Sequence, residues 1–275
     1  MKTIGSAIIM LVLTPSLFAD NGKELKLTSP DGTHEIAFYQ KQVSPAVNEL
    51  CYRVDYKSQP VVNESRAGLE LDNRIWEMAL GARNLKQPAC WMDNLEVDSV
   101  TYQPETDITW QPLYGERSSV RDHYRTGTLY LSKKDNSGYR LNIEVRAYNE
   151  GVAFRYHFPE TTNGLFLHII GEQTSFTMPQ GTMAYYERWA QGPYALRPLE
   201  GWGKEESERP LTLKLPDGLS VALLEAEMVD YARGKFRLSA DKPSTLETSL
   251  YSSVDIISPY STPWRVIMVG ERPVD

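Results

Sequence analysis

Apolar and polar residues alternate along most of this chain. Residues 139–148 read YRLNIEVRAY, which places Leu141, Ile143 and Val145 on one face of an extended chain and polar side chains on the other. The turn sequence NEG follows, and the alternation resumes in VAFRYHF up to Phe158. This pattern predicts a half-buried β-hairpin over residues 139–158.

The same alternation predicts further strands at residues 35–39, 49–56, 127–131, 164–170, 211–215 and 264–269. Turn sequences separate several of them, PDG at 30–32 and 216–218 and NSG at 136–138. Helical periodicity is scarce, and neither a repeat nor a linker interrupts the pattern. We therefore expect an all-β fold, an antiparallel β-sandwich in a single domain.

The first twenty residues, MKTIGSAIIMLVLTPSLFAD, have the layout of a secretory signal. Lys2 precedes an apolar run, Pro15 ends it, and Ala19 offers a small residue for cleavage. The sequence thus predicts a signal peptide at 1–19 and an exported, periplasmic domain at 20–275. No later stretch approaches the roughly 20 apolar residues of a membrane-spanning helix, so we expect no membrane insertion of the mature chain.

The net charge of the chain disfavours some classes of partner, and its two cysteines raise the question of a disulfide. The chain has 29 Lys and Arg against 36 Asp and Glu, a net charge of −7 spread along its length. This argues against nucleic acid or an anionic membrane surface as a partner. Cys51 and Cys90 allow one disulfide in an oxidising compartment, and two free thiols are equally compatible with a chain of this size.

Residues 110–124, WQPLYGERSSVRDHY, concentrate charged side chains between aromatic ends. A histidine beside a carboxylate is a common proton-transfer pair. In an extended chain, however, Asp122 and His123 point to opposite faces, so a direct dyad is disfavoured. We favour an interface or structural role for the charged candidates here, which are Glu116, Arg117, Arg121 and Asp122.

Two further groups of residues are compatible with sugar chemistry. In VALLEAEM, Glu225 and Glu227 share one strand face with Cα atoms about 6–7 Å apart, a spacing that permits a glycosidase pair but equally describes a solvated face. We favour the solvated face.

The second group lies in residues 185–209, where aromatic rings could stack on sugars while carboxylates bind hydroxyls. The aromatic candidates are Tyr185, Tyr186, Trp189 and Trp202. A long ordered loop pinned by its own rings is the alternative interpretation. The acidic oxygens here could also bind calcium, although the spacing of an EF-hand loop is absent.

Expected signatures of other enzyme classes are missing. The chain contains no GxSxG, HExxH, GxxxxGK[ST] or GxGxxG sequence, which disfavours serine hydrolases, zincins and nucleotide-binding proteins. Its four histidines show no close metal-ligand spacing.

Seven segments, in order, resemble the N-terminal domain of glycoside hydrolase family 97, which comprises α-glucosidases, such as the bacterial starch-utilisation enzymes, and α-galactosidases. They are LTSPDGTHEIAF near the mature start, SRAGLEL at 65–71, WQPLYGERSSVRDHY at 110–124, RLNIEVRAYNEGVAFRYHFP at 140–159, ERPLTLKLPDG at 208–218, LLEAEMVDYARGKFRL at 223–238 and STPWRVIMVG at 261–270. The resemblance implies a β-supersandwich of galactose-mutarotase-like fold, followed in the family by a catalytic (β/α)8 barrel and a small β-domain.

The resemblance also implies that the catalytic carboxylates belong to the barrel, so no catalytic residue is expected here. A barrel requires about 200 residues or more, and only five follow Gly270; we expect a truncated product or a fragment of a longer enzyme. The expected partners are that barrel and an α-linked oligosaccharide. Arg117 and Arg121 are the candidates for contact with the barrel.

A calcium ion shared with the barrel is the cofactor that the resemblance implies. The family's N-terminal glutamate near calcium belongs to a Glu-Tyr pair, whereas this chain reads Pro193-Tyr194, which leaves Glu187 as the candidate ligand.

Three functions remain open. They are an accessory domain of a family 97 enzyme, a free-standing periplasmic glycan-binding module without hydrolase activity, and a self-sufficient hydrolase using Glu225 and Glu227. Preference for glucose or galactose, and a retaining or inverting mechanism, also remain open.

Overall fold

Antiparallel β-strands account for nearly all regular structure in the computed structural model of this chain, which describes residues 19–20, 23–72, 92–133, 139–160 and 166–273. Within these residues the only helical segment is a 3-10 turn, η1, at Leu199–Gly201. No helix in this part of the chain has the length and apolar character needed to cross a membrane. The predicted all-β, antiparallel fold is confirmed.

The strands form three sheets. The largest has the order β1 (Ala19–Asp20), β7 (Leu95–Trp110), β8 (Val120–Lys133), β9 (Arg140–Tyr148), β10 (Gly151–Phe158), β22 (Trp264–Gly270), β17 (Ser220–Ala226), β16 (Leu211–Lys214), β13 (Met183–Tyr186) and β14 (Ala195–Pro198), with β21 (Tyr260–Ser261) beside β10. The second has the order β15 (Glu206–Ser207), β18 (Gly234–Leu238), β19 (Thr245–Leu250), β12 (Ser175–Thr177), β5 (Gln59–Arg66), β4 (Val47–Tyr56), β3 (His34–Ser44) and β2 (Glu24–Thr28). A small sheet contains β20 (Val254–Ile257), β11 (Phe166–Glu172) and β6 (Leu69–Leu71).

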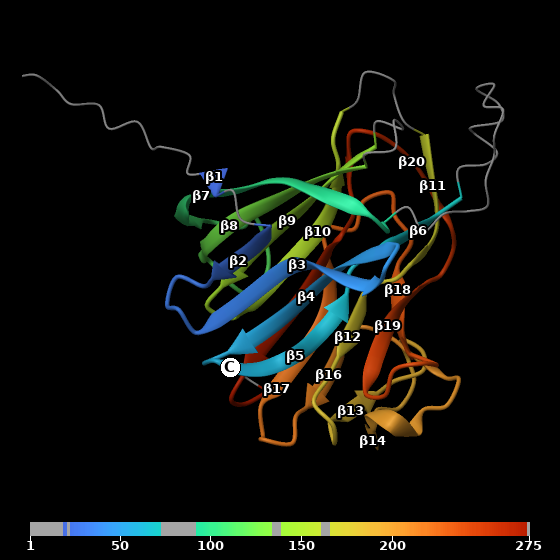
Figure 1. Cartoon of the computed structure of the whole chain (residues 1–275). Coiled ribbons are helices and arrows are strands. Elements are labelled where there is room, and N and C mark those ends of the chain that lie inside the picture. Colours follow the sequence, from blue (N-terminus) through green and yellow to red (C-terminus); the bar gives the residue numbers. More distant parts are fainter. Residues whose placement is uncertain (1–18, 21–22, 73–91, 134–138, 161–165, 274–275) are drawn as a thin grey trace, which may run out of the picture.

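The two large sheets pack face to face around an aromatic core. Figure 1 shows β3 and β4 in front of β8, β9 and β10. Phe154 of β10 contacts Phe38 of β3 and Tyr52 of β4, with ring centroids 5.1 and 5.0 Å apart. All three side chains are fully buried. Such burial is worth about 1.5–3 kcal/mol for a large apolar side chain, so this contact contributes strongly to sheet packing.

The hairpin predicted at residues 139–158 is present as β9 and β10. Its strands pair from Tyr148 and Gly151 onward, so the turn consists of Asn149 and Glu150. The alternating apolar residues on β9, such as Ile143 and Val145, are fully buried as predicted.

The alternating pattern in the sequence underestimates the length of the β7–β8 hairpin. Only residues 127–131 carry a clear alternating pattern, whereas β8 extends over Val120–Lys133 and pairs with the sixteen residues of β7. The register shifts between Gln103 and Thr106, next to Pro104. Proline has no N–H to donate to the ladder, and it is tolerated within a strand at such a bulge. A second shift lies between Val97 and Ser99, and the two shifts interrupt the alternation of β7.

A network of ion pairs lies inside the sandwich. Arg265 of β22, which is 2% exposed, donates to Glu172 through Nε at 2.8 Å and to Glu225 through Nη1 at 2.6 Å. Arg209 also pairs with Glu225. Burial alone would lower the pKa of Arg265, but the charge and hydrogen bonds of Glu172, with the charge of Glu225, raise it above its usual value. The guanidinium is therefore charged, and its position depends on these two carboxylates.

Several expectations concern residues outside the described part of the chain. The signal peptide is one, since the description begins at residue 19, and the NSG turn at 136–138 is another. Cys90 also lies outside it, so the pairing of Cys51 stays a prediction. Cys51 itself is buried, and burial raises the pKa of its thiol to about 11.

We predict that Arg265→Met lowers the free energy of unfolding by about 3–5 kcal/mol, because it leaves the buried Glu172 carboxylate without its partner. Urea denaturation measures the change. Arg237→Met is the matched control, since its pair with Glu247 is half-exposed, and should cost about 1 kcal/mol or less. The double variant Arg265→Met with Glu172→Met should recover part of the loss. Equal effects of Arg265→Met and Arg237→Met would contradict a structural role for the network.

A second prediction concerns pH. His34 is 1% exposed, and its Nε2 lies 3.3 Å from the carbonyl oxygen of Val269 on the facing sheet. Burial lowers the pKa of His34 below its usual 6.5, an effect that the Val269 carbonyl and the Asp31 charge offset only in part. The unfolded chain therefore binds a proton at a higher pH than the folded chain does. Stability should fall as pH decreases from 6.5 toward the folded-state pKa.

Urea midpoints at pH 7, 6 and 5 would measure this effect. The loss between pH 6.5 and 5 should be smaller in His34→Gln than in the wild type, because glutamine has no proton to gain. Parallel pH profiles for the two proteins would show that His34 does not contribute.

Candidate functional site

The segment 110–124 forms the tip of the β7–β8 hairpin and the start of β8. Trp110 pairs with Val120, and residues 111–119 form the connecting loop. The loop presents apolar side chains to solvent: Leu113 is 100% exposed and Tyr114 is 90% exposed. Glu116 and Arg117 are also exposed there. We call Trp110, Leu113 and Tyr114 the hairpin tip. Exposed apolar groups gathered at one place indicate an interaction surface.

Ion pairs join the two strands behind this tip. Arg121 of β8 makes a bidentate contact with Asp107 of β7, at 2.6 and 2.7 Å. Glu105 of β7 accepts from Arg125 at 2.9 Å and lies 2.7 Å from Nε2 of His123. The five side chains come from alternate positions of paired strands, so they share one face of the hairpin.

Asp122 does not join this ladder. It lies opposite Ile108 in the register, and its charge acts on Arg146 of β9. His123 instead contacts Glu105. Asp122 and His123 therefore face opposite sides, as strand alternation requires, and form no dyad. Arg121 and His123 of segment 110–124 thus join the two strands, and the Asp122–His123 dyad is absent.

The four aromatic candidates of residues 185–209 divide into two pairs. Tyr186 and Trp202 are 4% and 2% exposed, and their rings meet edge to face at 5.0 Å. Arg197 covers the Tyr186 ring at 4.5 Å. These two rings cannot stack on a sugar, which corrects the expectation of a four-ring platform. Tyr185 and Trp189 are 37% and 52% exposed and remain accessible.

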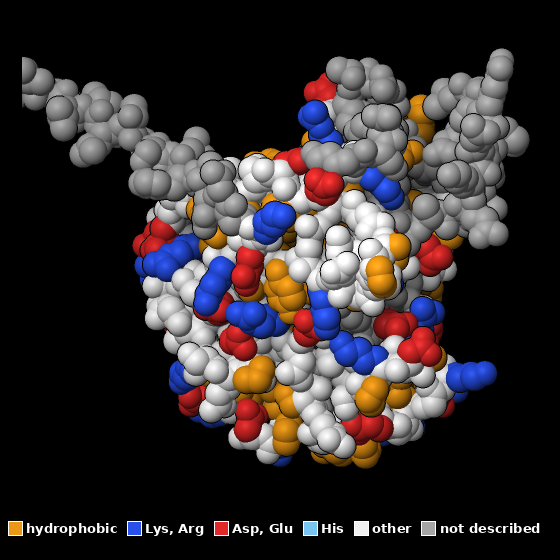
Figure 2. Space-filling model, viewed as in Figure 1, with side chains coloured by type: hydrophobic (Ala, Val, Ile, Leu, Met, Phe, Trp, Pro, Cys, Tyr) orange, Lys and Arg blue, Asp and Glu red, His pale blue; other side chains and the backbone are white. Residues whose placement is uncertain are grey.

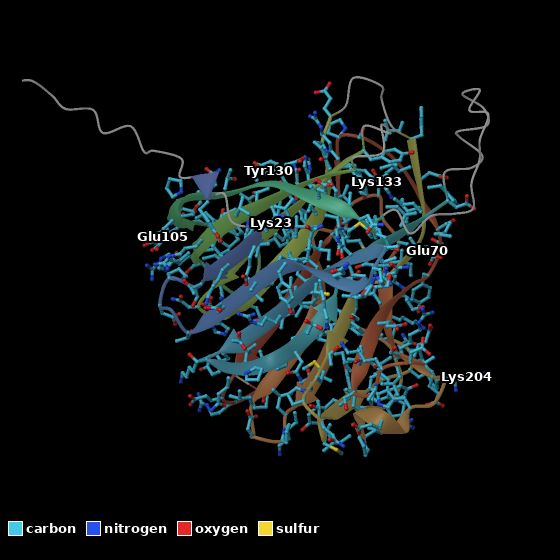
Figure 3. The ribbon with its side chains drawn as sticks, viewed as in Figure 1. Lys23, Glu70, Glu105, Tyr130, Lys133 and Lys204 are labelled. Atoms are coloured by element: carbon cyan, nitrogen blue, oxygen red, sulfur yellow. The ribbon has the colours of Figure 1, made fainter. Side chains whose placement is uncertain are left out.

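The hairpin and the aromatic segment lie far apart. Figure 3 shows Glu105, which belongs to the ion-pair ladder of the hairpin, and Lys204, within the aromatic segment, at opposite sides of the molecule. The accessible candidates of the hairpin loop and of the aromatic segment therefore belong to two separate surfaces.

Glu187 is 7% exposed and forms a hydrogen bond with the Tyr194 hydroxyl, which raises the pKa of that phenol. Calcium takes six to eight oxygen ligands. Across the described ranges, no group of three or more His, Cys, Asp or Glu side chains is placed to hold a metal ion. Glu187 is therefore not part of such a group, and a calcium ion bound to it would need further oxygen ligands.

Glu225 and Glu227 do not share a face, contrary to the sequence expectation. Glu225 points into the sandwich toward Arg265. Strand β17 ends at Ala226, and Glu227 has a φ of +55°, a left-handed conformation that turns its side chain away from the alternation. Its carboxylate instead accepts from Trp264 and Arg155 on the outer face. A paired-carboxylate mechanism across these residues therefore lacks its geometry.

A cavity of about 430 Å³ lies on the outer face of the largest sheet, formed by β9, β10, β17 and β22. We call it the outer-face pocket. Its walls include Arg146, Tyr148, Glu227 and Trp264, and its floor includes Ala153. The alternation within single strands does not reveal this pocket, because its residues meet only across neighbouring strands. The outward-facing side chains of β9 and β22, which are large or apolar, are the sequence feature that could have indicated the pocket.

A second cavity, of about 530 Å³, opens on the outer face of the other large sheet. It is polar, and its charges contact one another: Lys41 pairs with Glu64, and Arg237 pairs with Glu247. Figure 2 shows positive and negative side chains interleaved over this face. Such self-paired charges are typical of a solvated surface.

Comparison with known proteins identifies relatives over nearly the whole chain. Residues 27–275 match the family model of the glycosyl-hydrolase 97 N-terminal region. A retaining alpha-galactosidase from Bacteroides thetaiotaomicron is 23% identical over 313 residues, covering 100% of this chain and 42% of that protein.

Solved structures have the same fold. A glycoside hydrolase family 97 enzyme from Pseudoalteromonas sp. strain K8, solved with acarbose, superimposes with a TM-score of 0.77 at 24% identity, covering 90% of this chain and 36% of the enzyme. A beta-arabinopyranosidase gives a TM-score of 0.70 at 20% identity, over 90% of this chain and 40% of that one. The chain therefore spans about two-fifths of the length of these relatives.

Proposed function

Because this chain belongs to the glycosyl-hydrolase 97 N-terminal family, we propose that it serves as the N-terminal β-sandwich domain of an exported family 97 α-glucosidase or α-galactosidase. In this role it packs on and supports a catalytic (β/α)8 barrel. The observation that carries the proposal is the match over residues 27–275, against relatives of which it covers 36–42%. The remaining length of those relatives leaves room for a catalytic region.

Six carboxylates of the described residues are held in their ionised form, which disfavours these six as general acids. A glycosidase general acid needs a raised pKa. Every shifted carboxylate pKa among the described residues is lowered, and the carboxylates concerned are Asp31, Glu64, Glu105, Asp107, Glu200 and Glu208. In Glu105 the hydrogen bond from His123 is the main cause, and in Asp107 it is the hydrogen bond from Arg121. These acids stay ionised at neutral pH and are poor proton donors.

The hairpin tip is the surface best suited to docking. Leu113 and Tyr114 are almost fully exposed, and burying them against a barrel would gain about 25 cal/mol for each Å² of apolar surface removed from water. The ion-pair ladder of Arg121 and Arg125 behind the tip holds the two strands in register. The tip can therefore be presented on a defined support.

In this proposal, Glu187 would be one ligand of a calcium ion shared with the barrel. The buried carboxylate of Glu187 would supply one oxygen, and the barrel would supply the others. When bound, the ion would add positive charge near the sugar site.

A free-standing glycan-binding module is the alternative function. The exposed rings of Tyr185 and Trp189 favour it, since aromatic faces are usual sugar platforms. It predicts a sugar affinity that Trp189→Ala removes.

We expect the purified full chain, with calcium present, to show no hydrolysis of aryl α-glucosides or aryl α-galactosides above the buffer rate. Release of the aryl alcohol is measured by absorbance. Turnover that scales with protein and disappears in Glu227→Gln would overturn the supporting role. Glu227 suits this test because its side chain is 62% exposed, so glutamine preserves the fold. Glu225→Gln would confuse the result by breaking the buried network.

The docking role predicts the behaviour of a chimera in which this chain replaces the matched N-terminal part of the Bacteroides α-galactosidase. Leu113→Ser with Tyr114→Ser should lower hydrolysis of an aryl α-galactoside about tenfold or more, because misplacement of a supporting surface disturbs the active site. Ile257→Ser is the control, since Ile257 is 57% exposed on β20. Similar activities for the tip variant and the control would exclude the hairpin tip as the docking surface.

A further inference from the structure

The outer-face pocket has the composition of a small-molecule site. It combines apolar floor residues, including Ala153, Val266 and Met268, with a few charged groups at its edge. Ligand sites typically have this composition and volumes of about 300–1,000 Å³. We propose that the outer-face pocket binds one neutral sugar unit of an oligosaccharide. The proposal goes beyond the supporting role and does not depend on it.

Small residues create the pocket. Gly151 and Ala153 of β10 and Ala226 of β17 line it, between the larger side chains of Arg146 and Trp264. A Cβ added at Gly151 would lie 2.3 Å from the carbonyl oxygen of Ile267, and the φ of Gly151 is +156°. The close approach of β22 therefore requires glycine at this position, and a side chain that would fill the pocket is excluded there.

The walls are held in place before any ligand binds. The Arg146 guanidinium lies between the rings of Tyr124 and Trp264, at 4.5 and 4.7 Å from their centroids. It also donates to the Tyr148 hydroxyl at 3.3 Å. Arg155 lies 4.5 Å from the Trp264 ring. Because these side chains are already ordered, binding costs little additional conformational entropy.

Polar groups at the edge can bind hydroxyls. Glu227 accepts from Trp264 Nε1 at 2.9 Å and from Arg155 Nη1 at 3.0 Å, both through Oε2. Its side chain is nevertheless 62% exposed, so the carboxylate can be reached from the pocket. Glu150 and Arg146 also line the pocket. The set therefore includes acceptors and a donor next to apolar surface.

This chemistry selects a neutral, amphipathic ligand. Two carboxylates, Glu150 and Glu227, lie at the pocket, and two cations balance them: Arg146 in the lining and Arg155, which pairs with Glu227. The pocket therefore has no excess charge that would favour an ionic ligand. A pyranose ring fits both features, because its C–H face can lie on Ala153 and Met268 while its hydroxyls bond to the carboxylates and the guanidinium.

Isothermal titration calorimetry of the full chain with maltotriose and with melibiose tests the proposal. We expect saturable binding of at least one of them. Ala226→Trp should weaken it about tenfold or more by filling the pocket, since Ala226 is exposed and the ring adds no strain to the core. Thr212→Trp adds the same ring on the neighbouring strand β16, outside the pocket, and should bind like the wild type.

Glu227→Gln provides a second test that keeps the pocket volume and should also weaken binding. Near-ultraviolet circular dichroism checks that each variant is folded. Absence of binding to either sugar at millimolar concentration would overturn the proposal. So would binding that survives Ala226→Trp, or binding lost in Trp189→Ala but kept in Ala226→Trp, which would place the sugar on the aromatic segment. None of these outcomes bears on hydrolysis or docking, so failure here is distinguishable from failure of the supporting role.

Discussion

The buried pairing of Arg265 with Glu172 and Glu225 is the constraint on which the rest of the sandwich depends. Arg265 stands directly opposite Glu225 in the β17–β22 register, and Glu172 reaches it from β11 in another sheet. A charge removed from water is tolerated only while its partners stay in place. A packing that separates Arg265 from Glu172 would leave an uncompensated charge inside, so the network opposes such a packing.

The β17–β22 register also determines which side chains lie on the outer face of the largest sheet. Neighbours on a strand point to opposite sides, so Arg265 inside requires Trp264 outside. A slip of one residue would turn Trp264 toward the core and expose Arg265, and it would destroy the ion network and the outer-face pocket together. The stacking of Trp264 between Arg146 and Arg155 is thus a consequence of the pairing beneath it.

The sequence predicted those features that depend on neighbours along one strand. Alternation located the hairpin of β9 and β10 and the all-β class, because burial of every second residue is a local property. It failed for Glu227, where a left-handed backbone at the end of β17 breaks the period, and for Tyr186, whose burial depends on Trp202 sixteen residues later. The outer-face pocket was missed for a similar reason, since Arg146 and Trp264 meet only after β10 and β22 pair.

The hairpin tip and the outer-face pocket differ in size and polarity, which argues that they bind different kinds of partner. The hairpin tip is apolar, and Arg121 pairs with Asp107 behind it, so the tip suits a large partner that excludes water from Leu113 and Tyr114. The outer-face pocket is small, ordered by Arg146 and edged by carboxylates, so it suits a small polar ligand. A domain that docks through one surface keeps the other available to sugar, and the chain's carboxylates need not take part in bond cleavage for either contact.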